Sequence, residues 1–264
     1  MNEKTPLSTK SVKDFWEKNP LCFADNPYHP GSEKFFNFYD KQREEIEPPE
    51  FSSKLHEFSN YTNKKVLDVG CGNAYVLARY ASQGAEVNGI DITEAAIEIS
   101  KKRFKNNGLK GFFQLADAEK LPFPNNTFDL VCSMGVLHHV PNTQSALKEI
   151  FRVLKPGGKF IGMFYHRNSA RFHVYFRAQS LLRNKPMEEV VNENDGKGNP
   201  KAAVYTKKQL LNILPPFERI ELFVDYLPTR DIILKGSHLF PKNIFKSLAK
   251  FIGWNLYVKA TKPI

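Results

Sequence analysis

The stretch VLDVGCGNA, residues 66–74, decides the fold of this chain. A short apolar run ends in Gly70-Cys71-Gly72 and leads directly into a helical stretch, AYVLARYASQG. A buried strand that ends in Gly-x-Gly at the start of a helix lets backbone amides approach a ligand closely. In a parallel sheet, ligands bind beyond the carboxyl ends of the strands. The stretch therefore predicts a strand–turn–helix unit that forms one wall of a ligand site.

Strand-like and helical runs alternate outward from this stretch. The expected strands are short and rich in Val, Ile, Phe and Leu, and they cover residues 65–69, 86–90, 111–115, 128–134 and 159–165. Thr93 and Asn142 precede two of the helical runs and are residue types that favour the N-cap. Strands that alternate with helices at this spacing predict βαβ units and a parallel sheet.

The remaining segments predict how the chain is organised. One more helix is expected over 206–217, followed by strands over 218–227 and 254–262, which brings the sheet to about seven strands. Residues 1–62 predict a helical, aromatic-rich leader that closes over the site as a lid or simply packs on the sheet. Two insertions, 166–205 and 228–252, interrupt the pattern. We expect one α/β domain over 63–264 that carries both insertions.

Composition narrows the class of protein. The chain of 264 residues has 38 Lys and Arg against 28 Asp and Glu, and its net charge of +10 favours anionic partners without choosing among metabolites, nucleic acid and lipid headgroups. Cys22, Cys71 and Cys132 show no paired spacing of a zinc site or disulfide framework. No apolar run approaches the ~20 residues that cross a bilayer, and the N-terminus lacks the apolar run of a signal peptide. We expect a cytoplasmic protein.

Two acidic residues and one tyrosine limit the class of ligand that this site can bind. Asp91 closes the second strand about 20 residues after the glycine turn, where a carboxylate binds the two hydroxyls of a ribose. Asp68, just before the turn, suits an ammonium group better than phosphates. Tyr75 stands where a dinucleotide fingerprint requires its third glycine, and no phosphate-binding G-x-x-x-x-G-K-[ST] run occurs. These residues argue against an NAD-linked dehydrogenase and against ATP.

Five successive motifs resemble those of the class I S-adenosylmethionine-dependent methyltransferases, in the group that includes the ubiquinone- and menaquinone-biosynthesis enzymes. The motifs are VLDVGCGNA (66–74), GIDIT (89–93), LADAEKLPF (115–123), FDLVCSMGVLHHVPN (128–142) and EIFRVLKPGGKF (149–160). The resemblance implies a Rossmann-like, doubly wound, mostly parallel seven-stranded sheet with an antiparallel last strand. It also implies S-adenosyl-L-methionine as the cofactor and S-adenosyl-L-homocysteine as its product.

The resemblance implies nine cofactor-binding residues on the first four motifs. Those at the methionine end are Asp68, Gly70, Cys71, Gly72 and Met134. Those at the adenosine end are Asp91 for the ribose hydroxyls, Ile92 against the adenine, and Asp117 with the Ala118 amide at the adenine edge. The commonest pattern of the turn has a further glycine at the position of Ala74, where a small residue still fits.

Fewer sequence features indicate which residues contact the methyl acceptor. His139 follows the fourth strand and is the candidate that orients or deprotonates the acceptor, although two adjacent histidines can also simply pack in a loop. The candidates for contact with the acceptor are Tyr28, His138, Tyr165, His166 and Arg167. No other His, Cys or acid stands at ligand spacing, so we expect no metal.

The leading hypothesis is methyl transfer by in-line displacement to a small-molecule or lipid-like acceptor. A nucleic-acid methyltransferase and a non-catalytic protein that binds S-adenosylmethionine are the alternatives; the SMGVLHH region lacks the [DNS]-P-P-[YFW] run of the former. As a helix, residues 242–252 would place apolar residues on one side and lysines on the other. This pattern suits either a helix lying on an anionic membrane or an ordinary surface helix. The acceptor atom and the oligomeric state stay open at this point.

Overall fold

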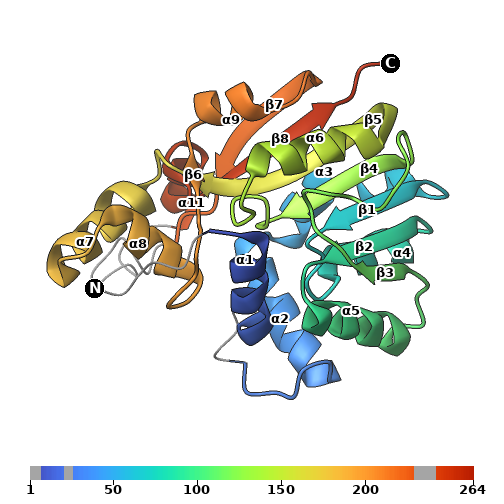
Figure 1. The fold of residues 1–264 in the computed structure, drawn as a ribbon, viewed down its shortest axis with the longest axis horizontal. Coiled ribbons are helices and arrows are strands. Elements are labelled where there is room, and N and C mark those ends of the chain that lie inside the picture. Colours follow the sequence, from blue (N-terminus) through green and yellow to red (C-terminus); the bar gives the residue numbers. More distant parts are fainter. Residues whose placement is uncertain (1–6, 21–25, 229–241) are drawn as a thin grey trace.

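The computed structural model describes residues 7–20, 26–228 and 242–264, without the side chains of 242–245. Its centre is an eight-stranded sheet in the order β3-β2-β1-β4-β5-β8-β7, with β6 paired to β5 (Figure 1). The strands are β1 (Lys65–Val69), β2 (Glu86–Asp91), β3 (Phe112–Leu115), β4 (Phe128–Met134), β5 (Leu154–His166), β6 (Val204–Tyr205), β7 (Glu218–Asp225) and β8 (Asn255–Thr261). Among these strands, β8 runs antiparallel to both of its neighbours.

This sheet confirms the predicted fold class, including the antiparallel last strand. Strand order reverses between β1 and β4, because β2 and β3 extend the sheet on one side of β1 and β4 and β5 extend it on the other. Ligands of such sheets bind beyond the carboxyl ends of the strands at this reversal. One strand differs from the prediction: β6 lies within the insertion 166–205, where no strand was expected.

Helices cover both faces of the sheet because successive strand residues point to opposite faces. Val66 and Leu67 of β1 are both fully buried, but in two different apolar clusters. The first cluster includes residues of α4 (Tyr75–Ser82) and α5 (Glu94–Asn106), and the second includes residues of α6 (Thr143–Val153) and α9 (Lys207–Ile213). Thr93 and Asn142 cap α5 and α6 as predicted, each accepting a hydrogen bond from a backbone N–H three residues on.

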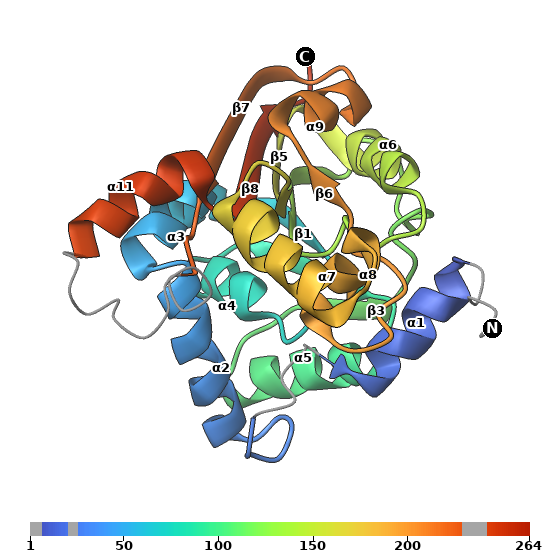
Figure 2. The ribbon, with the colours of Figure 1, turned by 90° about the vertical axis from the view of Figure 1, so that its left-hand side faces the viewer.

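The leader forms α1 (Thr9–Lys18), α2 (Glu33–Ile46), α3 (Pro49–His56) and the 3-10 turn η2 (Phe58–Tyr61). The buried Arg103 of α5 holds α2 in place: it donates to both carboxylate oxygens of Asp40 (2.9 and 2.6 Å) and lies 4.4 Å from the ring centroid of Phe36. Figures 1 and 2 show α1 on the side of the sheet toward which the parallel strands point. The leader therefore reaches the carboxyl ends of the strands.

The insertion 166–205 lies on the same side (Figure 2). It contains the π-helix η3 (Arg171–Phe176), α7 (Arg177–Arg183), α8 (Met187–Asn192) and the 3-10 turn η4 (Glu193–Asp195). Phe176, Val190 and Val191 are buried in the first apolar cluster and attach the insertion to the domain.

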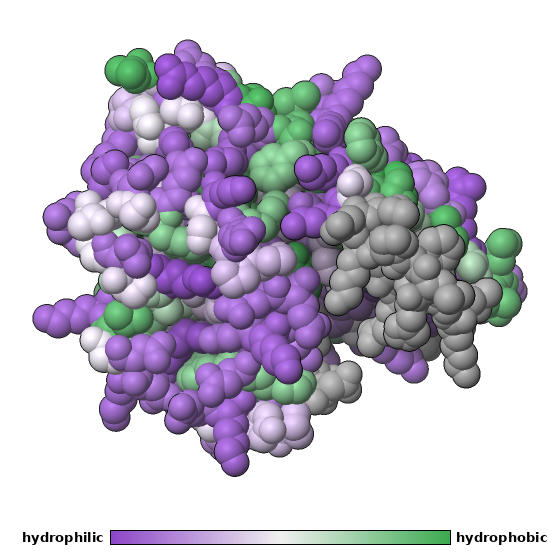
Figure 3. Space-filling model, turned by 180° about the vertical axis from the view of Figure 1, so that it is seen from behind, coloured by the Kyte–Doolittle hydropathy of each residue, from purple (hydrophilic) through white to green (hydrophobic). Residues whose placement is uncertain are grey.

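The insertion 228–252 contains α11 (Lys242–Ile252), and residues 229–241 lie outside the described residues. Within the described chain, none of the helices combines the length and the apolar character that a membrane span requires. The face opposite to that of Figure 1 carries mainly hydrophilic residues, with apolar residues in small separate groups (Figure 3).

Candidate functional site

The glycine turn after β1 has a backbone conformation that favours glycine. Gly70 has φ +78°, and a Cβ atom added there would lie 2.4 Å from Cγ2 of Val136. The N–H groups of Gly70 and Cys71 donate to the carbonyl oxygen of Ile90 (2.8 and 2.9 Å), so the turn is closed against β2. A larger residue at position 70 would need both a strained φ and a shift of Val136.

Asp91 ends β2 beside this turn and fastens it. Its Oδ2 accepts a hydrogen bond from the Gly72 N–H (3.1 Å), and its Oδ1 accepts from the N–H and the hydroxyl of Thr93 (3.0 and 2.9 Å). Burial raises the pKa of Asp91, while these hydrogen bonds favour its ionised form.

One pocket brings these groups together at the carboxyl ends of the strands. It is lined by all nine residues that the resemblance implies for the cofactor: Asp68, Gly70, Cys71, Gly72, Asp91, Ile92, Asp117, Ala118 and Met134. The leader adds Val12 and Trp16 from α1 and Tyr39 and Arg43 from α2. The local motifs therefore meet in one cavity, and the leader forms part of its wall.

Several buried atoms on residues of this pocket lack hydrogen-bond partners, and two of them lie on Asp68 and Arg43. Asp68 is 4% exposed and its Oδ1 has no partner, and burial raises its pKa to about 7. The Nε of Arg43 is also buried without a partner, while its Nη2 donates to Glu47 (2.8 Å). A ligand with an ammonium group and a carboxylate would supply both missing partners. The amino-acid end of S-adenosylmethionine has both groups, so the residues present fit it.

Asp117 stands at the other end of the pocket. Its Oδ1 accepts from the Glu119 N–H (2.9 Å), and its Oδ2 accepts from the hydroxyl of Thr9 in α1 (3.3 Å). Nearby, Glu17 of α1 accepts from the N–H groups of Glu94 and Ala95 at the start of α5 (3.1 and 3.3 Å). Helix α1 is thus attached to two of the segments that line the cavity.

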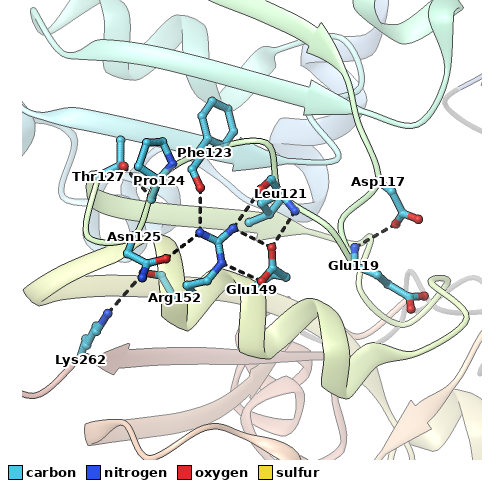
Figure 4. Close-up of polar contacts among 10 residues, drawn as sticks. All are labelled: Asp117, Glu119, Leu121, Phe123, Pro124, Asn125, Thr127, Glu149, Arg152 and Lys262. Carbon is cyan, nitrogen blue, oxygen red and sulfur yellow. Dashed lines mark hydrogen bonds and ion pairs between the residues drawn. The ribbon is translucent and has the colours of Figure 1, made fainter.

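Arg152 of α6 holds the segment that follows Asp117 (Figure 4). It donates to the carbonyl oxygens of Leu121 and Phe123 (2.9 and 2.8 Å), and it is paired with Glu149 (2.7 Å). Glu149 in turn accepts from the Leu121 N–H (2.8 Å). Both residues belong to the fifth motif, EIFRVLKPGGKF, to which the sequence analysis assigned no site role.

The acceptor side of the pocket contains His139, Tyr165 and Asp195. The Nδ1 of His139 lies 2.6 Å from the Lys201 carbonyl oxygen, and its Nε2 lies 3.7 Å from Oδ2 of Asp195. The Tyr165 hydroxyl donates to Oδ1 of Asp195 (2.6 Å), and the Trp16 ring lies 4.9 Å from that of His139. Sequence reasoning missed Asp195, because one acid in a polar segment gives no signal that it folds onto a pocket.

Four residues expected near the acceptor are not among those that line this pocket: Tyr28, His138, His166 and Arg167. Tyr28 is 41% exposed in the leader. His138 is buried behind His139, with ring centroids 3.9 Å from Tyr165 and 4.2 Å from His139.

Strand geometry separates the last two of these residues from Tyr165. His166 follows Tyr165 in β5 and therefore points to the opposite face, where its Nδ1 lies 3.0 Å from the Gly253 carbonyl oxygen. Arg167 is exposed. In the part of the chain that the structure describes, no group of three or more His, Cys, Asp or Glu residues is placed to hold a metal ion.

Comparison with known proteins agrees with this geometry. Residues 67–162 match the family model described as "Methyltransferase domain". The chain is 41% identical over 101 residues to a sterol 4-C-methyltransferase of Caenorhabditis elegans, which covers 38% of this chain and 30% of that protein. It is 37% identical over 116 residues to the ubiquinone biosynthesis O-methyltransferase of an Azoarcus species, which covers 44% of this chain and 48% of that protein.

A solved structure extends the likeness to the whole chain. The [4+2]-cyclase SpnF superposes with a TM-score of 0.63 at 18% identity, over 99% of this chain and 100% of that chain. At this identity the likeness shows the fold, which includes the leader and the insertions. The chain spans less than half the length of the two curated relatives, so the family statement rests on the matched segment. The matched segment, residues 67–162, is therefore a methyltransferase domain of the class I type, whose cofactor is S-adenosylmethionine.

Proposed function

We propose that this protein transfers the methyl group of S-adenosylmethionine to a small-molecule or lipid-like acceptor. The observation that carries the proposal is the single pocket in which the glycine turn, Asp91 and Asp117 meet an aromatic acceptor side. The sterol and quinone names of the two relatives support an acceptor of this kind. The pocket lies beneath α1 and the first insertion, which favours a small acceptor over a strand of nucleic acid.

The pocket residues bind the cofactor in two halves. Asp68 and Arg43 hold the ammonium and carboxylate groups, the turn at Gly70–Gly72 and Met134 surround the methionine chain, and Asp91 accepts from the ribose hydroxyls. The adenine lies against Ile92 and is read by Asp117 and the Ala118 amide. All of these residues line the cavity. The bound cofactor supplies a methyl group already activated on a sulfonium.

The protein's own work is then alignment and exclusion of water. Holding the acceptor atom in line with the methyl group provides effective molarity, which lowers the barrier by several kcal/mol. Helix α1 serves as a lid, since its Trp16 contacts His139 and its Thr9 contacts Asp117 across the pocket. Closing the cavity in this way keeps water from competing for the transferred group.

Calorimetric titration tests the cofactor half of the proposal. The wild-type protein is expected to bind S-adenosylmethionine and S-adenosylhomocysteine, and Asp91→Ala is expected to weaken both by about 10- to 100-fold, because two charge-assisted hydrogen bonds are lost. Glu86→Ala, at the exposed start of the same strand, is the matched control and should bind normally. A folded wild-type protein that binds neither compound would refute the proposal.

Transfer itself is tested with a labelled methyl donor and extracts or acceptor panels. Label that moves to an apolar or amphiphilic product, and that is lost with Asp91→Ala, supports the enzyme. Tight cofactor binding with no transfer to any fraction favours the non-catalytic alternative.

We also propose that α11 contacts anionic membranes. Leu248 and Phe251 are 42% and 75% exposed, Lys246 and Lys250 are exposed beside them, and Ala249 is buried on the opposite side. Apolar side chains with flanking lysines favour an anionic lipid surface. This arrangement would bring the protein to lipid-like acceptors.

Vesicle co-sedimentation tests this contact. Phe251→Ser is expected to reduce binding to phosphatidylserine-containing vesicles by about tenfold, because the apolar area that enters the lipid is lost. Leu211→Ser, which changes an apolar residue of α9 that is 45% exposed, should leave binding unchanged. Equal binding of the wild-type protein to vesicles of phosphatidylcholine alone would contradict the role of the lysines.

A further inference from the structure

The ring of His139 is held in one tautomer. Its Nδ1 lies 2.6 Å from the carbonyl oxygen of Lys201, and since a carbonyl oxygen only accepts, Nδ1 carries the hydrogen. Burial lowers the pKa of His139, so the neutral ring is the favoured form. The second nitrogen, Nε2, is therefore a hydrogen-bond acceptor on the wall of the pocket.

A second acceptor faces this nitrogen. Oδ2 of Asp195 lies 3.7 Å from Nε2, is buried and has no hydrogen-bond partner. The other oxygen of Asp195 accepts from the Tyr165 hydroxyl (2.6 Å) and from the Asn194 side-chain amide (3.0 Å), which hold the carboxylate in this orientation. Two acceptors that face each other in a buried site lack one proton between them.

The other groups around the ring do not supply that proton. Lys201 donates its ammonium hydrogens to the carbonyl oxygens of Val140 and Pro141 (2.7 and 3.1 Å). Burial lowers the pKa of His138, whose ring centroid is 4.2 Å from that of His139, so it is neutral as well. None of the described residues around the ring supplies the missing proton, so a bound molecule with an X–H group would complete the arrangement.

We propose that His139 takes a proton from the methyl acceptor and that Asp195 is the counter-ion that stabilises the imidazolium formed. The inference rests on the proposed function and deepens it: the acceptor carries a proton on the oxygen or nitrogen that is methylated. The proton of that X–H bond moves to Nε2, and its electron pair stays on X and forms the bond to the methyl carbon. The carbon–sulfur bond breaks, and its electron pair stays on the departing sulfur.

This assignment separates the two residues by role. His139 touches the acceptor and is a catalytic residue, whereas Asp195 acts through His139 and is a positioning residue. The insertion 166–205 thereby contributes to the chemistry and not only to the cover of the pocket. An acceptor carbon without an acidic proton would make no use of this pair.

Nitrogen-15 NMR of histidine-labelled, full-length protein with S-adenosylhomocysteine bound tests the proposal without turnover. The His139 signals are assigned by their loss in His139→Gln. We expect one protonated and one unprotonated ring nitrogen at neutral pH. The probes are 4-butylphenol and 4-butyltoluene; the first has a hydroxyl group where the second has a methyl group. The phenol should shift the unprotonated nitrogen and bind at least about tenfold more tightly.

Variants then assign the second acceptor. In Asp195→Asn the new amide donates to Nε2, so the nitrogen signal should move without any probe and the preference for the phenol should vanish. Tyr165→Phe removes the hydroxyl that donates to Oδ1 and accepts from the Asn194 amide, and it should reduce the preference for the phenol. This variant keeps the test available if Asp195→Asn does not fold. Glu188→Gln, an exposed acid of the same insertion, should behave as wild type.

The outcomes distinguish this inference from the proposed function. A wild-type ring protonated on both nitrogens, equal binding of the two probes, no binding of either, or a preference that survives in Asp195→Asn would overturn the inference. If S-adenosylhomocysteine itself does not bind, the proposed function fails. If it binds normally and the probes are not distinguished, only the role of His139 and Asp195 fails.

Discussion

Asp68→Asn is expected to weaken binding of S-adenosylmethionine more than about 100-fold at pH 8, because the ammonium group of the ligand would be buried without its counter-charge. Asp68 is 4% exposed and its Oδ1 has no partner in the free protein. The matched control is Asp129→Asn, which changes an acid at the opposite end of the sheet that is paired with Lys155. Calorimetry should find the control unchanged, and wild-type affinity in Asp68→Asn would exclude Asp68 from the site.

The same residue predicts a pH dependence with a defined sign. Burial raises the pKa of Asp68 to about 7 in the free protein, so below pH 7 the carboxyl must lose a proton before it can pair with an ammonium group. Affinity should therefore fall as pH falls, by about tenfold between pH 8 and pH 6, and Asp68→Asn should remove this dependence. A wild-type affinity that rises toward acid would contradict the argument.

Stability of the free protein should change in the opposite direction. The folded-state pKa of Asp68 lies above its unfolded value, so the contribution of Asp68 to the stability of the free protein falls as pH rises through the interval from about 4 to about 7. Asp68→Asn removes a buried carboxylate whose Oδ1 has no partner and is expected to raise the melting temperature at pH 8. The substitution thus distinguishes an effect on binding from an effect on folding, since it should lower the affinity for S-adenosylmethionine and raise the stability of the free protein.

Glu47→Gln is expected to lower the free energy of unfolding by about 3 to 5 kcal/mol, because it leaves the guanidinium of Arg43 buried without a counter-charge. Glu47 is 1% exposed, accepts from Arg43 Nη2 (2.8 Å) and from the Tyr257 hydroxyl of β8 (2.9 Å), and so joins the leader to the sheet. Burial by itself would lower the pKa of Arg43, and Glu47, together with Tyr39 and Tyr257, more than offsets this and raises it.

Urea denaturation measures this effect. Glu50→Gln, which changes an exposed acid on the neighbouring helix α3, is the control and should stay within about 0.5 kcal/mol of wild type. An unfolding free energy for Glu47→Gln that matches the control would mean that water or the ligand, and not Glu47, balances Arg43. Added S-adenosylmethionine should restore part of the lost stability, because its carboxylate approaches the same guanidinium.

Local motifs predicted the residues that line the cofactor side of the pocket. The glycine turn and Asp91 follow from the pattern of residues, whereas Asp117 was implied by the resemblance to the methyltransferase family. Gly70, Asp91 and Asp117 lie at or just beyond the carboxyl ends of parallel strands, and a parallel sheet brings those ends to one edge. The structure accordingly places them along one cavity.

The acceptor half could not be predicted in the same way. Tyr165 and His166 were equal candidates in the sequence, and the alternation of β5 decides that only Tyr165 faces the pocket. The leader was expected to be helical, but its pattern contains no information on where Trp16 would lie. Contacts between segments far apart in the chain leave no repeating pattern in the sequence, so they could not be predicted from it.

The sequence by itself determined the α/β class, the glycine turn and the succession of strands and helices along the chain, because hydrophobic periodicity and turn chemistry act over a few neighbouring residues. Only the tertiary structure decided that Arg43 of the leader and Asp195 of the first insertion reach the same cavity. Their placement depends on how the leader and the first insertion pack onto the carboxyl ends of the strands. That packing is set by burial and by pairing of charges across the fold, which no single segment encodes.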